Sequence, residues 1–104
     1  MNTQNQETAA NHAAPAHLEV SIRYPAATKP FVDPHASPSE TVGALKVRVL
    51  AAFEVTETSG PDGQTLFFLY FGDERIDDPS RMLGQIAGDK HSLKLKLVQQ
   101  LVQG

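Results

Sequence analysis

Residues 38–53, with the sequence PSETVGALKVRVLAAF, constrain the fold most because they have the pattern of one amphipathic helix. The apolar residues recur at spacings of three and four, which gathers them on one helical stripe: Val42, Leu45, Val49, Ala52 and Phe53. Thr41, with Ser39 as the alternative, is the expected N-cap, because its hydroxyl can accept a hydrogen bond from a free amide. We expect Lys46 and Arg48 to point away from the stripe into water. Such a helix requires a sheet that covers its apolar side.

Four further segments have the pattern of β-strands. Residues 18–24 alternate apolar and polar side chains, which is typical of a strand with one wet face. Residues 31–36 predict a second strand antiparallel to the first, and the prolines in and before it favour the edge of the sheet. Residues 65–71, TLFFLYF, predict a strand that is apolar on both faces. Residues 93–97 alternate leucine with lysine and predict the closing strand.

The connecting segments complete the expected order of elements. Residues 54–64 have strong turn chemistry and predict a long loop. Residues 72–75 predict a turn, Ile76 a short strand, and residues 77–80 a turn before one helical turn around residues 82 and 83. The chain is therefore ββαββ with a short helical turn. If the last strand returns beside the first, an α+β mixed sheet wraps over one main helix.

The composition indicates one folded domain between two disordered ends. A chain of 104 residues with 40% apolar content can bury one modest core. Residues 1–16 are rich in Asn, Gln, Thr and Ala and predict a disordered N-terminal arm. Residues 17–98 form the expected domain. Because the alternation fails after Val98, we expect residues 99–104 to form a flexible C-terminal tail.

Charge and hydropathy exclude several classes of partner. The formal charge is −3 with both signs interspersed, so nothing indicates binding to nucleic acid or to a membrane surface. The sequence has neither a membrane-spanning apolar run nor the pattern of a signal peptide, and a cytoplasmic protein is the default expectation. The absence of cysteine excludes thiolate chemistry within the chain. Any thioester would require the sulfur of a partner.

No catalytic or metal-binding motif is present in the sequence. The histidines are scattered without the spacing of metal ligands: His12, His17, His35 and His91. Asp77 and Asp78 are adjacent carboxylates, but Pro79 favours a turn as their role. There is no phosphate-binding loop, nucleophile elbow or candidate triad. We expect no catalytic residue, no metal and no cofactor, so the chain is predicted not to be an enzyme.

Three segments resemble ubiquitin and its β-grasp relatives. The helix PSETVGALKVRVL is similar to the helix of ubiquitin with its preceding proline and cap. The segment LYFGDERIDDPSRML resembles the third strand, turn and fourth strand, and HSLKLKL resembles the last strand. The order and spacing also agree. The resemblance implies a ubiquitin-like β-grasp fold.

The same resemblance implies the role of a protein modifier. In conjugated members of the family, an activating enzyme adenylates the C-terminal glycine with ATP and Mg²⁺, cysteines of partners carry it as a thioester, and an isopeptide bond joins it to a target amine. Gly104 is the residue that matches this position, preceded by Leu101, Val102 and Gln103. Ubiquitin itself ends in Arg-Gly-Gly, so this chain departs from that pattern. Glycine suits the role because it lacks a Cβ and passes through a narrow channel.

The resemblance also implies a surface for partners on the exposed face of two strands. The matching residues are Phe68, Tyr70, Lys94 and Lys96, and exposed aromatics flanked by lysines are a plausible hot spot. The alternative is that the N-terminal arm or packing at the sheet edge covers Phe68. Candidate acceptor lysines for chain formation are Lys29, Lys46 and Lys90.

The chain further resembles the modifiers of bacterial operons associated with antiviral defence against phage. Those operons encode the implied partners, which are an activating enzyme, a conjugating enzyme and a JAB-type zinc peptidase besides the target protein. The free chain is expected to be a monomer. Two alternatives stay open, because one fold serves many functions. These are a non-covalent ubiquitin-like docking domain and a sulfur carrier with a C-terminal thiocarboxylate.

Overall fold

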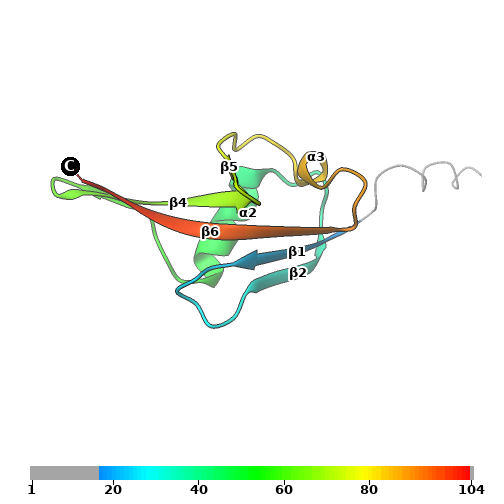
Figure 1. The fold of residues 1–104 in the computed structure, drawn as a ribbon, viewed down its shortest axis with the longest axis horizontal. Coiled ribbons are helices and arrows are strands. Elements are labelled where there is room, and N and C mark those ends of the chain that lie inside the picture. Colours follow the sequence, from blue (N-terminus) through cyan, green and yellow to red (C-terminus); the bar gives the residue numbers. More distant parts are fainter. Residues whose placement is uncertain (1–16, 104) are drawn as a thin grey trace, which may run out of the picture.

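The computed structural model describes residues 17–103, which form one sheet and two helices (Figure 1). In chain order the elements are β1 (Leu18–Arg23), β2 (Phe31–Ala36), α2 (Val42–Ala52), β3 (Thr58–Gly60), β4 (Gly63–Phe71), β5 (Glu74–Ile76), α3 (Leu83–Ala87) and β6 (Ser92–Gln103). The predicted N-terminal arm and Gly104 lie outside the described residues.

The sheet has the order β2-β1-β6-β4-β3, and β5 pairs with β4 beside β3. β1 and β6 are parallel, and the other neighbouring strands are antiparallel. The predicted α+β class, with the last strand returning beside the first, is therefore confirmed. β2 lies at an edge, where its prolines remove no hydrogen bond from the interior of the sheet.

The core lies between α2 and one face of the sheet. From the helix, Val42, Leu45 and Val49 are buried, as the apolar stripe predicts. From the sheet, alternate residues of β1, β4 and β6 meet them: Leu18, Val20, Ile22, Phe67, Leu69, Leu93, Leu95 and Leu97. Burial of this apolar surface is the main source of stability.

The two helices begin next to one another. The Thr41 hydroxyl accepts a hydrogen bond from the Ala44 amide at 3.2 Å, which confirms the predicted N-cap. The Gly84 amide in α3 donates to the Pro38 carbonyl at 2.8 Å. A Cβ on Gly84 would lie 3.1 Å from both Cβ and the carbonyl oxygen of Pro38, so any larger residue would push this segment outward by a few tenths of an ångström.

The predicted loop over residues 54–64 is wrong in its second half. β3 begins at Thr58 and pairs antiparallel with β4, which begins at Gly63. The two residues between Gly60 and Gly63 form the turn of a hairpin. The predicted turn is present, but it connects two strands that both begin within this segment.

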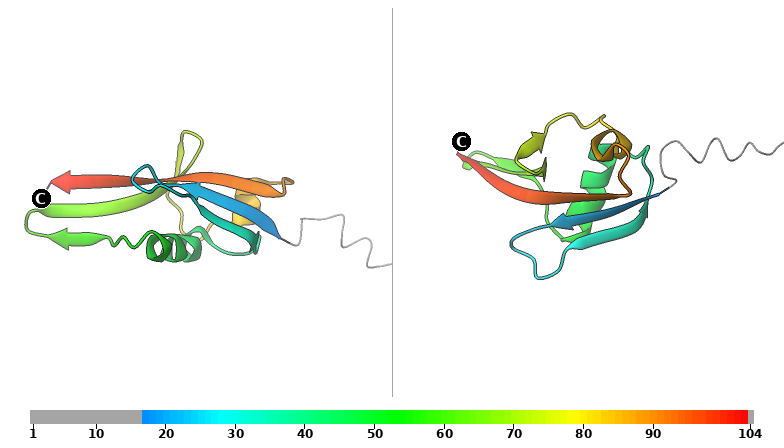
Figure 2. Two further views of the ribbon diagram at one scale, coloured as in Figure 1. Left: turned by 90° about the horizontal axis from the view of Figure 1, so that it is seen from below. Right: turned by 45° about the vertical axis from the view of Figure 1, so that its right-hand side comes forward.

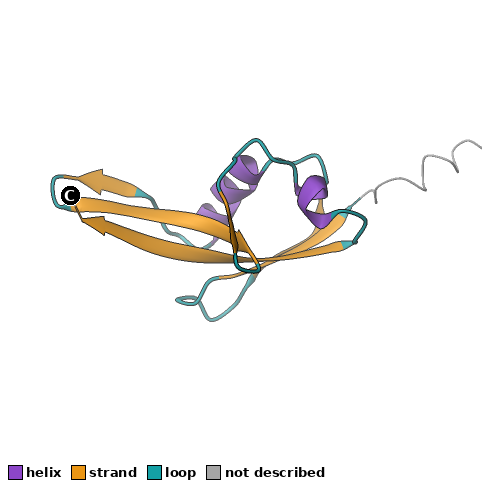
Figure 3. Ribbon diagram, turned by 45° about the horizontal axis from the view of Figure 1, so that its top comes forward, coloured by secondary structure: helices purple, strands orange, loops and turns teal. Residues whose placement is uncertain are grey.

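The predicted flexible tail is also wrong for residues 99–103. β6 runs on to Gln103, and residues 96–103 pair with β4 as far as Gly63. Beyond Leu97 both faces of this strand leave the helix-covered core, so the backbone ladder does not require alternation of side chains. We call β3, residues 63–67 and residues 99–103 together the finger. Figures 2 and 3 show it extending past the end of α2.

Candidate functional site

The end of β6 is the first candidate site, because it carries three of the residues predicted to present the C-terminus. Leu101 is 69% exposed, Val102 is half-buried and Gln103 is exposed. They lie at the tip of the finger, opposite residues 63–65 of β4. Gly104, the fourth predicted residue, is outside the described residues. The chain therefore runs to Gln103 as an ordered strand that is directed away from the core (Figure 1).

The hydrogen-bonding direction of each residue in β6 follows from its pairing with β1. The Glu19 amide donates to the His91 carbonyl at 2.9 Å, so odd-numbered residues direct their backbone groups toward β1. By alternation, Gln100 and Val102 direct theirs toward β4. Two such residues with their partners on β4 make roughly four ladder hydrogen bonds.

Release of this segment is close to balanced in free energy. Roughly four bonds at a net 0.5–1.5 kcal/mol each contribute about 2–6 kcal/mol. Ordering the backbone of five residues costs about 5–10 kcal/mol, and the apolar side chains that share the outer face of β4 and β6, among them Leu66, Val98 and Val102, offset part of it. The end of the finger is thus among the elements that open most easily.

The second candidate site is the outer face of the sheet, where the structure brings together all four predicted surface residues. Tyr70 of β4 is opposite Lys96 of β6, and Phe68 is opposite Val98. Lys94 lies two residues before Lys96 and therefore on the same face. The four side chains form one continuous area on two adjacent strands.

Phe68 is half-buried, and two cations cover it. The Arg75 guanidinium lies 4.4 Å from the ring centroid, and the Lys46 ammonium lies 5.7 Å from it. Both distances are within the range of cation–π contacts. The alternative that Phe68 is covered is therefore nearer to the structure than a bare aromatic hot spot, and Tyr70 on the same face is likewise half-buried.

Two arginines on this face, Arg23 and Arg75, were not predicted from the sequence. Arg23 pairs with Lys96, Lys96 with Tyr70, and Tyr70 with Arg75, so the four residues form one row across four strands. The tight turn GDER after β4 was the available signal, because it sets the register that places Arg75 opposite Tyr70. The row places three cationic side chains on the outer face, of which Arg75 is paired with Asp77 at 2.6 Å.

Lys46 does not point freely into water as predicted. Its ammonium lies 2.9 Å from Glu57 Oε2, and the same oxygen accepts the Phe67 amide at 2.9 Å. The Phe67 hydrogen bond, followed by Lys46, lowers the pKa of the Glu57 carboxyl. Of the three candidate acceptor lysines, Lys46 is thus held in an ion pair, while Lys29 and Lys90 are exposed.

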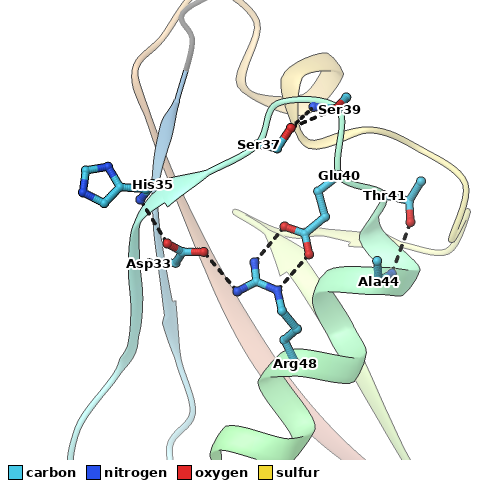
Figure 4. A network of polar contacts seen from close by, with 8 residues as sticks. All are labelled: Asp33, His35, Ser37, Ser39, Glu40, Thr41, Ala44 and Arg48. Carbon is cyan, nitrogen blue, oxygen red and sulfur yellow. Dashed lines mark hydrogen bonds and ion pairs between the residues drawn. The ribbon is translucent and has the colours of Figure 1, made fainter.

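Arg48 also departs from the prediction, because it joins α2 to the segment before it and to β2 (Figure 4). Its guanidinium binds both carboxylate oxygens of Glu40 at 2.9 and 2.7 Å and Asp33 at 3.0 Å. The His35 amide, and then Arg48, lower the pKa of Asp33. Hydrogen bonds with Glu40 raise the pKa of Arg48. We interpret this network as structural.

Within residues 17–103, no group of three or more His, Asp or Glu side chains is arranged to hold a metal ion. The His17 and His35 rings contact each other edge to face, with centroids 5.5 Å apart. In the same part of the chain, neither helix has the length and apolar character needed to cross a membrane.

The fold is the ubiquitin-like β-grasp. The structure is similar to that of Caldiarchaeum subterraneum ubiquitin, with a TM-score of 0.61 and 21% identity over 85% of this chain and 99% of that one. It is also similar to the ubiquitin-like domain of an Arabidopsis thaliana protein, with a TM-score of 0.55 and 20% identity over 94% of this chain and 90% of that one. No protein-family model and no curated protein matches the sequence.

Proposed function

We propose that this chain is a ubiquitin-like protein modifier that is joined to target amines through Gly104. The observation that carries the proposal is the direction of β6, whose last residues leave the core and end at the exposed tip of the finger. The fold shared with an archaeal ubiquitin supports the same reading. In this proposal the chain is a substrate of enzymes and performs no catalysis itself.

The proposed chemistry has three steps, and partner enzymes supply the catalytic groups. The Gly104 carboxylate attacks the α-phosphorus of ATP, which forms an acyl adenylate and releases pyrophosphate. A partner cysteine thiolate then displaces AMP and forms a thioester. Finally, a target amine displaces the thiol and loses a proton, which leaves an amide bond.

Before the first step, the end of β6 must leave β4. A narrow active-site channel admits an extended single strand but not a three-stranded finger. The near balance between ladder hydrogen bonds and chain entropy makes this release accessible at thermal energies. An activating enzyme that binds the released strand would recover the lost backbone hydrogen bonds.

An assay for thioester formation tests the proposal. The purified chain is incubated with ATP, Mg²⁺ and an extract of the cells that produce it naturally, and we expect a larger species that disappears on treatment with a thiol reductant. A variant that lacks Gly104 is the matched control and should form none. An adduct of equal yield from the shortened chain would refute the role of Gly104. Intact mass is measured in parallel, and replacement of one oxygen by sulfur would instead assign a sulfur carrier.

A non-covalent docking domain is the second candidate function. The specific observation in its favour is the row of Arg23, Lys96, Tyr70 and Arg75, which provides an aromatic ring between cations on an open sheet face. In this case the shortened chain would keep its partner, while Tyr70→Ala would lose it. Retention of the partner by Tyr70→Ala counts against docking through this face.

The wider setting of the proposal is a bacterial defence pathway. Its support is the resemblance of the sequence to modifiers encoded beside an activating enzyme, a conjugating enzyme and a JAB-type zinc peptidase. Genes for those three enzymes next to the gene of this chain are the expected finding.

A further inference from the structure

Within residues 17–103, most edges of the sheet carry features that oppose pairing with another chain. At β2, prolines remove amide donors, and at β4, the Glu57 carboxylate takes the Phe67 amide between β3 and β5. β3 is only three residues long. These are the usual devices against pairing with another chain. The pairing of β1 with β6 ends at Lys96, so within residues 17–103 no strand lies on the β1 side of β6 from Leu97 onward, while β4 stays paired with its other side.

Along this open edge, β6 is paired with β4 on one side and has unpaired backbone groups on the other. Odd-numbered residues of β6 direct their N–H and C=O groups toward β1 where β1 is present. The same alternation leaves the groups of Gln99, Leu101 and Gln103 without a strand partner. The edge sequence LVQQLVQ contains no charge and no proline, and it combines apolar residues with glutamine. Such a segment is prone to pair with another extended strand.

We propose that this edge binds the same edge of a second copy of the chain, antiparallel and with Gln100 on the two-fold axis. This register places Gln99 opposite Leu101 of the second copy, and it places Val98 opposite Val102 on the outer face. Gln99 of each copy then exchanges two backbone hydrogen bonds with Leu101 of the other copy, and the symmetry repeats this pair. The resulting interface is isologous, as expected for a dimer.

The length of the edge selects this register. Seven residues, 97–103, lie beyond the end of the β1 pairing, and antiparallel pairing about Gln100 uses all seven. A shift of the axis to Gln99 drives the tip of one copy into β1 of the other. A shift to Leu101 leaves part of the edge unpaired. The finger extends beyond the helices, so the two cores lie at opposite ends of the interface (Figure 3).

Charge complementarity favours a second copy as the occupant. Asp62 lies in the turn at the tip of the finger, next to Gly63, which pairs with Gln103. In the proposed dimer this tip approaches the end of β1 and the following loop of the other copy. Arg23 and Lys29 lie there, and all three charged residues are exposed. The uncharged edge itself brings no like charges together.

Sedimentation of the full chain over about three decades of concentration tests the proposal, because dimer formation depends on concentration. We expect a shift from the mass of one chain to twice that mass. Gln99→Pro removes an amide that faces the open edge and leaves the ladder with β4 intact, so it should raise the dissociation constant at least about tenfold. Gln99→Thr keeps the amide and is the matched control, which should dimerise normally.

A charge exchange and amide exchange complete the test. Asp62→Lys should weaken the dimer, and Arg23→Asp in the same chain should restore it. The Gln99 and Leu101 amides should gain protection as concentration rises, and they should gain more than the Gln100 amide, which already bonds to β4 in the single chain. A chain that stays monomeric overturns the proposal, and so does a dimer that Gln99→Pro leaves unchanged. Protection of the Gln99 amide in a monomer would mean that another segment of the same chain covers the edge, which also overturns it.

Discussion

Replacement of Glu57 tests how the root of the finger is held. One oxygen of this carboxylate, Oε2, lies 2.9 Å from the Phe67 amide and 2.9 Å from the Lys46 ammonium. A hydrogen bond to a charged acceptor contributes about 1.5–3 kcal/mol when buried. The Glu57 side chain is 35% exposed, so we take the lower end of that range. The partly exposed ion pair adds about 0.2–1 kcal/mol.

We therefore expect Glu57→Ala to lower the free energy of unfolding by about 1.7–2.5 kcal/mol, measured by urea denaturation. A loss of about 2 kcal/mol corresponds to a fall in Tm of roughly 8–16 °C for a domain of this size. Glu57→Gln keeps an acceptor for the amide, and Lys46→Met removes the ion pair and the long cation–π contact with Phe68 but leaves the Phe67 hydrogen bond, so each should cost less than Glu57→Ala. Equal losses from Glu57→Gln and Glu57→Ala would refute the view that the Phe67 amide is the main partner.

Three further predictions concern the helix contact, acid stability and release of the strand. Gly84→Ala should lower Tm measurably, because the new Cβ would lie 3.1 Å from Pro38. Gly60→Ala is the control and should change Tm little, because no atom lies within 4 Å of its Cβ position. The pKa of Asp33 is lowered in the folded state, so its stabilisation is present above the unfolded pKa and is lost as pH falls. Stability measured from about pH 5 to pH 2 should decrease, with a smaller slope in Asp33→Asn. Thr65→Cys with Leu101→Cys joins directly opposite residues of a chain that has no other cysteine, and the disulfide closes a loop of roughly 36 residues worth up to about 4 kcal/mol. The oxidised form should fail to form the thioester, whereas the same variant, reduced and freed of reductant before the assay, should form it; thioester formation by the oxidised form would contradict the need for release.

Local periodicity was enough to predict the elements that surround the core. The stripe of α2, the Thr41 cap and the alternation in β1 are all properties of neighbouring residues, and burial on one face enforces them. The edge position of β2 could be predicted from proline, because proline has no amide hydrogen to donate to a neighbouring strand. The resemblance to ubiquitin added the β-grasp fold as a whole, which local patterns leave open.

The finger and the charged contacts could not be predicted in this way. Residues 99–103 pair with a strand more than thirty residues away, and no buried face imposes alternation on them. Arg48 binds Asp33 across 15 positions of sequence and Glu40 across 8, so no helical spacing reveals the network. The partner face was predicted from the family resemblance, but its two arginines depend on the register of β1 and β5.

A search for branched peptides tests the central claim most directly. Lys96 is the last lysine or arginine of the sequence, so trypsin leaves the octapeptide LVQQLVQG on any lysine to which the chain has been joined. Mass spectrometry of proteins that carry an affinity-tagged copy in its natural cells should find target lysines bearing this octapeptide through Gly104. The variant without Gly104 should yield none. If conjugates are absent while the full-length chain is abundant and its thioester assay is negative, the proposed modifier function is contradicted.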